Sequence, residues 1–213
     1  MFRPFRLIMI AALALGVYAG FIQTPTGART PDAFDPEKVA QFELASWQAK
    51  HAKKDFDYYS NTVQMLREQY RYSWWKAALA GFYVSRATTQ FQEMHNRFER
   101  ALPDLEDAAE VEKSWLNAKL DAPAVARAQL DWMVTRRMPG LDTVDHVGAL
   151  MANEYALRYG VPQDRVAGAT MYRAQAMAIR DENRESPDWA GVSKALTDSY
   201  RSLKNGLTKR SRF

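Results

Sequence analysis

The chain contains two stretches, residues 34–51 and 120–137, that resemble each other at an offset of 86 residues. In this first block, Phe34-Asp35-Pro36 corresponds to Leu120-Asp121-Ala122, and Val39-Ala40 corresponds to Val125-Ala126. In a second block, Arg71-Tyr72, Ala80-Gly81 and Arg86-Ala87 recur 87 residues later as Arg158-Tyr159, Ala167-Gly168 and Arg173-Ala174. A chain with an internal sequence repeat usually folds by stacking similar structural units against one another. We therefore predict two tandem units that arose by duplication, against the alternative that Ala-rich amphipathic helices resemble one another by default.

The apolar residues recur three and four positions apart, which is the spacing of one helix face. Each half divides into four such segments, with starts at Asp35-Pro36 and Pro162 and a stop at Gly160. Proline fits the first helical turn, and glycine accepts the left-handed conformation that ends a helix. No stretch alternates long enough to indicate a strand. The prediction is an all-α fold with two four-helix units, residues 35–119 and 120–207, followed by a basic tail at 208–213.

The N-terminus has the pattern of an export signal. Arg3 and Arg6 precede an uncharged run from residue 7 to residue 22, and a segment rich in Pro, Thr and Gly follows. Val17-Tyr18-Ala19 offers small side chains for cleavage by a signal peptidase. The competing prediction is an uncleaved anchor, although a bilayer core needs about 20 apolar residues. In both cases we expect residues 1–23 to be the leader or anchor, residues 24–34 a flexible tether, and the helical part to lie outside the cytoplasm, in the periplasm or on the inner membrane. A soluble cytoplasmic protein is the remaining alternative.

Charge and composition exclude several classes of protein. The net charge of +4 includes two arginines of the leader, so it is too small to indicate a nucleic-acid surface. Clusters such as Lys50, Lys53 and Lys54 are interpreted as solvated helix ends. The chain has no cysteine, which excludes disulfides and thiolate chemistry.

No motif indicates a metal, a cofactor or a catalytic site. Di-iron helical bundles need Glu-x-x-His, and neither His95 nor His146 has a carboxylate at that spacing. Gly-x-Ser-x-Gly and phosphate-binding loops are absent. A catalytic carboxylate pair assembled from Glu43, Glu68 and Glu154 stays open, but pairing of these carboxylates with arginines such as Arg71 or Arg158 is the simpler hypothesis.

Eight residues are candidates for binding a ligand or partner. The repeated polar residues are most simply structural, with a ligand groove between the units as the alternative, and Arg86 is expected to point inward, toward Glu43 or Glu68. Consecutive helix positions are about 100° apart, so only one ring of Trp74 and Trp75 is expected in the core. The candidates are Arg71, Tyr83, Arg86, Arg158, Tyr172, Arg173, Trp47 and Trp75.

Taken together, the patterns favour a non-catalytic helical scaffold or assembly protein of a bacterial-type cell envelope. Its predicted partner is another envelope protein, with membrane contact through residues 7–22 if they stay uncleaved. The alternative is a binding module for a small or acidic ligand in the Arg- and Tyr-lined groove. The layout loosely resembles helical-repeat scaffolds, but the tetratricopeptide spacing is absent and the period here is far longer.

Overall fold

The computed structural model describes residues 13–18, 23–25, 28–93, 97–116 and 118–208, and within them every regular element is a helix. This confirms the all-α prediction. The predicted cleavage site, much of the apolar run and nearly all of the basic tail lie outside the described residues. The first half contains α2 (Pro36–His51), α3 (Asp55–Tyr70), α4 (Trp74–Glu93), the 3-10 turn η2 (Phe98–Ala101) and α5 (Leu102–Leu116). The second half contains α6 (Ala122–Thr135), α7 (Val144–Tyr159), α8 (Gln163–Glu182) and α9 (Trp189–Thr208).

Local capping residues start and stop these helices. The carboxylate of Asp35 accepts hydrogen bonds from backbone amides at the start of α2, and Asp121 does the same for α6. The N-cap of α7 is Thr143, whose hydroxyl accepts a hydrogen bond from the backbone amide of His146. Gly160 ends α7 in the left-handed conformation, as predicted. Capping side chains satisfy amides that have no partner inside the helix, so these short sequence signals set the helix boundaries.

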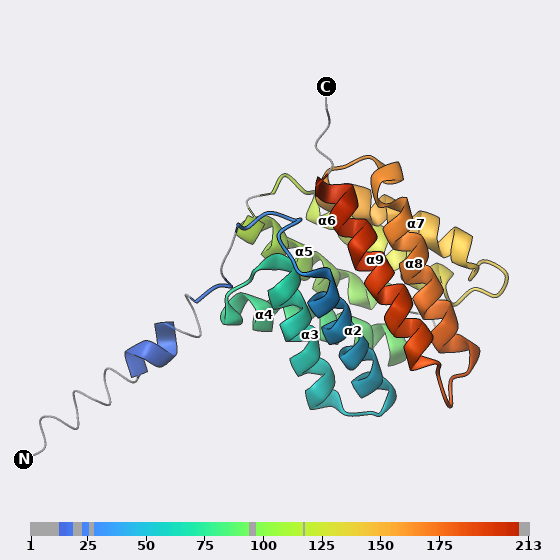
Figure 1. Cartoon of the computed structure of the whole chain (residues 1–213), viewed down its shortest axis with the longest axis horizontal. Helices are drawn as coiled ribbons and strands as arrows, with labels where there is room; N and C mark the ends of the chain where they lie inside the picture. Colours follow the sequence, from blue (N-terminus) through green and yellow to red (C-terminus); the bar gives the residue numbers. More distant parts are fainter. Residues whose placement is uncertain (1–12, 19–22, 26–27, 94–96, 117, 209–213) are drawn as a thin grey trace, which may run out of the picture.

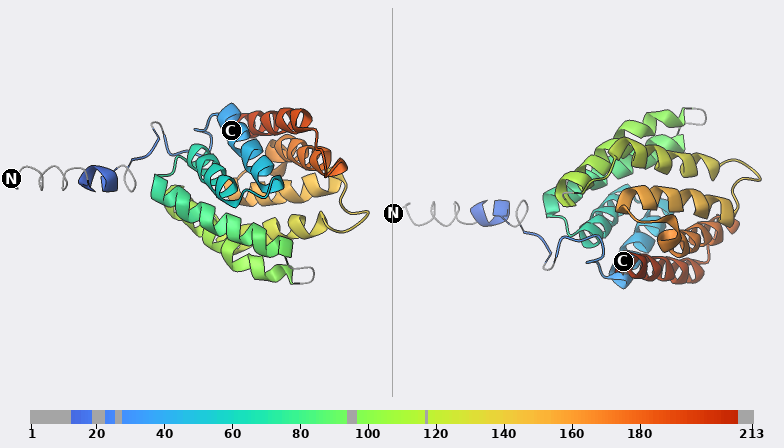
Figure 2. Two further views of the ribbon diagram at one scale, coloured as in Figure 1. Left: turned by 90° about the horizontal axis from the view of Figure 1, so that it is seen from below. Right: turned by 90° about the horizontal axis from the view of Figure 1, so that it is seen from above.

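The eight helices close into a ring. Each helix packs mainly against its neighbours in the chain, and α2 also packs against α9, which joins the two ends (Figure 1). Seen along the perpendicular direction, α4, α5 and α6 group on one side, with α2, α8 and α9 on the other (Figure 2). Apolar clusters fill the space between them, with Leu130 and Met151 in one cluster and Leu196 and Tyr200 in another. The ring thus places residues from both halves around one interior.

Three large side chains do not lie where the predicted helix faces put them. Phe56, Trp74 and Phe82 belong to runs of apolar residues three and four positions apart, a spacing that predicts core positions, but they are 80%, 42% and 47% exposed. The buried face of α4 is formed instead by small residues, including Ala77, Ala80 and Ala87. Small residues let α4 approach α3 and α5 closely, and Trp74 and Phe82 remain outside while Phe91, near the end of the helix, is buried.

Residues 13–18 form a short helical segment that stands apart from the ring (Figure 1). No helix among the described residues combines the length and the apolar character that a membrane crossing requires. The predicted tether is partly docked. The Arg29 guanidinium lies 4.2 Å from the centre of the Trp115 ring, and Phe34 is buried against Tyr200.

Candidate functional site

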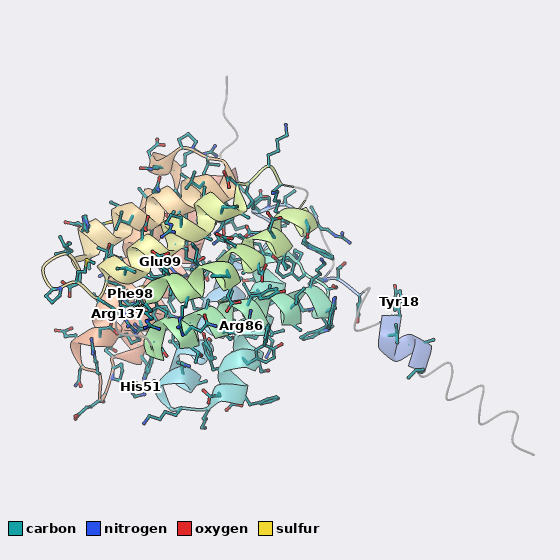
Figure 3. The ribbon with its side chains drawn as sticks, turned by 180° about the vertical axis from the view of Figure 1, so that it is seen from behind. Tyr18, His51, Arg86, Phe98, Glu99 and Arg137 are labelled. Carbon is teal, nitrogen blue, oxygen red and sulfur yellow. The ribbon has the colours of Figure 1, made fainter. Side chains whose placement is uncertain are left out.

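A pocket of about 770 Å³ opens into the interior of the ring. We call it the ring pocket. Its lining comes from α2, α3 and α4 of the first half and from α6 and α8 of the second. It lies where α2, α4, α6 and α8 end, and Figure 3 shows His51 and Arg137, from two of these helix ends, at the same end of the molecule. Its size falls within the range of about 300–1,000 Å³ that is usual for small-molecule sites.

A buried ion pair joins the two halves at the inner wall of the pocket. Arg173 of α8 binds the Glu43 carboxylate of α2 through both terminal nitrogens, one of them at 2.8 Å. The Tyr200 hydroxyl of α9 donates to the same carboxylate at 2.7 Å. Burial works to lower the pKa of Arg173, but Glu43 together with Tyr155 and Tyr200 outweighs burial and raises that pKa well above the usual value. Arg173 is therefore charged and fully engaged.

Near the mouth of the pocket, two arginines share one carboxylate. Asp181 accepts from Nη2 of Arg136 at 2.5 Å and from Nε of Arg180 at 2.8 Å. Burial lowers the pKa of Arg136, and the neighbouring Arg180 lowers it further. Nη1 of Arg136 contacts the sulfur of Met177 at 3.3 Å. A thioether is a weak acceptor, so this guanidinium keeps the capacity to bind an anion.

Charge and apolar surface are combined around the pocket. Seven Lys and Arg side chains but only three carboxylates line it, which leaves an excess of positive charge. The Arg180 guanidinium lies 4.7 Å from the centre of the Trp47 ring, and that of Arg137 lies 4.3 Å from the Phe91 ring. The remaining apolar lining includes Met65, Val84, Trp132, Met133 and Met177. Such a site fits a molecule with an apolar body and an acidic group.

A second buried network lies behind the pocket wall. Arg158 of α7 pairs with both Glu112 of α5 and Glu154 on its own helix, and also donates to Gln129 at 3.2 Å. Trp132 donates to Glu154 at 3.0 Å. Since Gln129 and Trp132 also line the pocket, this network fixes two of its wall residues.

Of the eight candidates, only Trp47 and Arg173 line the ring pocket. Arg86 was expected to point inward, but its side chain is 45% exposed and pairs with Asp104. Figure 3 shows Arg86 well apart from Arg137 and His51. Tyr83 is beside Arg86 on α4, and Tyr172 lies in a separate pocket of about 690 Å³ between α8 and α9. The groove built from Arg86, Arg173, Tyr83 and Tyr172 is therefore not formed.

The other three candidates have different surroundings. Arg71 lies just past α3 in a left-handed conformation and binds Glu68 at 3.1 Å, whereas Arg158 lies within α7. The two sequence-matched arginines thus occupy different positions on their helices. Trp75 is 51% exposed, and Trp74 is exposed as well, so neither ring is in the core as one was expected to be.

The pocket residues missed in the sequence are Arg136, Arg180 and Asp181. The available signal is the presence of arginines near the ends of α6 and α8, which resembles the Lys50, Lys53 and Lys54 cluster interpreted above as a solvated helix end. A helix C-terminus does favour cations, so this pattern alone does not distinguish a pocket from a surface. Arg136 and Asp181 are 45 residues apart in the sequence, and they form a pocket only because the ends of α6 and α8 come together in the fold.

Catalytic and metal chemistry gain no support from the described residues. Glu43, Glu68 and Glu154 each pair with an arginine, as the simpler hypothesis held, and do not form a catalytic pair. The described part of the chain holds no group of three or more side chains able to ligate a metal ion. Comparison of the chain with protein-family models, curated proteins and solved structures gave no match.

Proposed function

We propose that the chain is a binding module for an acidic organic ligand, held in the ring pocket between its two halves. The observation that carries this proposal is the Arg136–Asp181–Arg180 group, in which two guanidiniums share one carboxylate at a pocket wall. A ligand carboxylate or phosphate would supply the second negative charge. Charge-assisted hydrogen bonds to guanidinium are among the stronger polar contacts in proteins.

The ligand's apolar part would lie against Trp47, Phe91 and Trp132. These rings form pocket walls, and burying an apolar body against them adds hydrophobic affinity. The module therefore requires both features of its ligand, an acid group and an apolar body. An inorganic anion alone would bind weakly.

The test is isothermal titration of the full chain with aromatic carboxylates, fatty acids and organic phosphates, each beside its neutral amide or alcohol analogue. Acids are expected to bind and neutral analogues to bind at least tenfold more weakly. Arg180→Gln should weaken binding by about ten- to a hundredfold, the equivalent of the roughly 1.5–3 kcal/mol of a charged hydrogen bond.

The matched control is Arg127→Gln. Arg127 lies on α6, the helix that Arg136 caps, but it pairs with Glu99 on the exposed surface, away from the pocket. Its variant should bind acids as the unmodified chain does. Equal affinity for acids and neutral analogues, or equal losses in both variants, would contradict the proposal.

The scaffold interpretation stays as the second candidate, and exposed aromatic residues of α4 favour it. Trp75 and Phe82 are about half exposed, and aromatic residues are enriched where proteins meet partners. Co-purification of a stable complex from solubilised membranes would support this candidate. Failure to find a complex would argue against the scaffold, and failure to find a pocket ligand would argue against the binding module.

Duplication and export also stay proposals. Duplication is supported by the matched N-caps Asp35 and Asp121 and by the full burial of Val39 and Val125. The different settings of Arg71 and Arg158 show that any common register has slipped by the end of the second helix. Mass spectrometry of the mature N-terminus would decide between a cleaved leader and an anchor.

A further inference from the structure

The two tryptophans that begin α4 remain at the surface. Trp74 is 42% exposed and Trp75 is 51% exposed, although Trp is highly buried on average. They lie about 100° apart around the helix, so they present apolar surface over a wide sector. An apolar surface of this kind on a helix end is suited to contact with something outside the ring.

A cation accompanies this aromatic surface. The Arg67 guanidinium lies 4.3 Å from the centre of the Trp74 ring. Among the described residues Arg67 forms no ion pair, and Glu68, which acts on it electrostatically, pairs with Arg71 at 3.1 Å, so the Arg67 guanidinium can attract an external anion. We call Arg67, Trp74 and Trp75 the tryptophan end.

The N-terminal segment reaches the ring beside the tryptophan end. Arg29 stacks on Trp115, whose indole nitrogen donates to the carbonyl of Tyr70 at 3.1 Å, four residues before Trp74. Figures 1 and 2 both show the chain entering the ring next to the start of α4. The uncharged run of residues 7–22 ends only seven residues before Arg29. A fully extended stretch of that length spans at most about 25 Å, so the tryptophan end is close to wherever this apolar run lies.

We propose that the tryptophan end lies against an anionic lipid surface. Trp side chains are enriched at the boundary between hydrocarbon and water because their rings are apolar and their N–H is polar. An Arg beside them gains electrostatic attraction to acidic headgroups. With the apolar run in the same bilayer, the domain has two contacts with the membrane, and these fix its orientation. This places the opposite end of α3, with Phe56, away from the lipid.

The absence of cysteine permits a direct test. In the full chain, Trp75→Cys and Phe56→Cys each create a single site for an environment-sensitive fluorophore. Phe56 is 80% exposed and lies in the first turn of α3, about 21 Å along the helix from Tyr70. Each labelled protein is reconstituted into vesicles of phosphatidylcholine, with or without phosphatidylglycerol.

The fluorophore at position 75 is expected to shift to the blue in phosphatidylglycerol vesicles, and the fluorophore at position 56 to stay in water. Adding Arg67→Gln should reduce the shift at position 75. An aqueous spectrum at position 75, or equal shifts at both positions, overturns the proposal. An equal shift at position 75 in pure phosphatidylcholine vesicles overturns the claim that the lipid surface must be anionic. A shift at position 75 that appears only when another envelope protein is added identifies a protein partner and overturns the lipid assignment.

Discussion

Arg86 and Arg173 occupy matched positions in the two halves of the sequence, but their surroundings differ. The side chain of Arg173 is 17% exposed and joins α8 to Glu43 on α2. The side chain of Arg86 is 45% exposed and reaches only from α4 to Asp104 on the next helix. The ring explains the difference, because α8 faces the junction of the two halves while this part of α4 faces solvent. A repeated residue therefore does not have a repeated role.

The first and largest prediction uses this pair. Arg173→Met should destabilise the chain by about 3–5 kcal/mol, since it leaves the buried Glu43 carboxylate without its cation. Arg86→Met also leaves a buried carboxylate, that of Asp104, without its cation, but it should cost less because the Arg86 guanidinium is 45% exposed and already screened by solvent. Chemical denaturation of both variants measures the difference. The double variant Glu43→Leu/Arg173→Met should recover most of the stability, since a well-packed apolar pair often replaces a buried ion pair without loss. Equal losses of unfolding free energy in the two single variants would show that the two ion pairs contribute equally to stability.

The features that could be predicted from the sequence are those set by local signals. Asp35, Asp121 and Gly160 act within a few residues of themselves, so the helix starts and stops could be found without knowing the fold. Phe56, Trp74 and Phe82 could not be placed. Their helices carry apolar residues on more than one face, and the face that is buried depends on how closely the neighbouring helices approach.

The candidate site was less predictable than the fold. Arg136, Arg180 and Asp181 come from two helices that are distant in sequence, and closing the ring brings them together. Glu43 was identified as a partner for a buried arginine, but the arginine was wrong. The match between Arg86 and Arg173 made the two look equivalent, whereas only Arg173 faces α2.

The second prediction compares the matched glycines Gly81 and Gly168. A Cβ at Gly81 would lie 2.7 Å from Cγ2 of the buried, branched Val63, whereas at Gly168 it would lie 2.8 Å from the Ser202 hydroxyl oxygen. Ala gains up to about 1 kcal/mol over Gly in a helix, but overpacking costs about 1–3 kcal/mol. Gly81→Ala should therefore lose up to about 2 kcal/mol.

For Gly168→Ala, the Ser202 side chain can rotate away, so this variant should be neutral or slightly more stable. Thermal unfolding of both variants, side by side, provides the comparison. A more damaging change at Gly168 would mean that α8 and α9 are packed more tightly than α3 and α4.

The third prediction, with the smallest expected effect, compares two buried arginines. Arg173 has one carboxylate partner, and Arg158 has two. Burial raises the pKa of Glu112, and Arg158 only partly offsets this. The folded chain therefore holds the Glu112 proton to a higher pH than the unfolded chain does. Stability from this group is present at low pH and is lost as pH rises from the usual carboxyl pKa through the raised one.

Glu112→Gln should remove that loss, because the amide does not ionise. Arg158 stays paired with Glu154 in this variant, so its charge is not left alone, in contrast to Arg173 after loss of Glu43. Urea denaturation over a series of pH values should show the variant gaining stability relative to the unmodified chain as pH rises through this window. Parallel curves would mean that Glu112 ionises as easily inside the ring as in water, and that Arg158 stabilises both of its carboxylates fully.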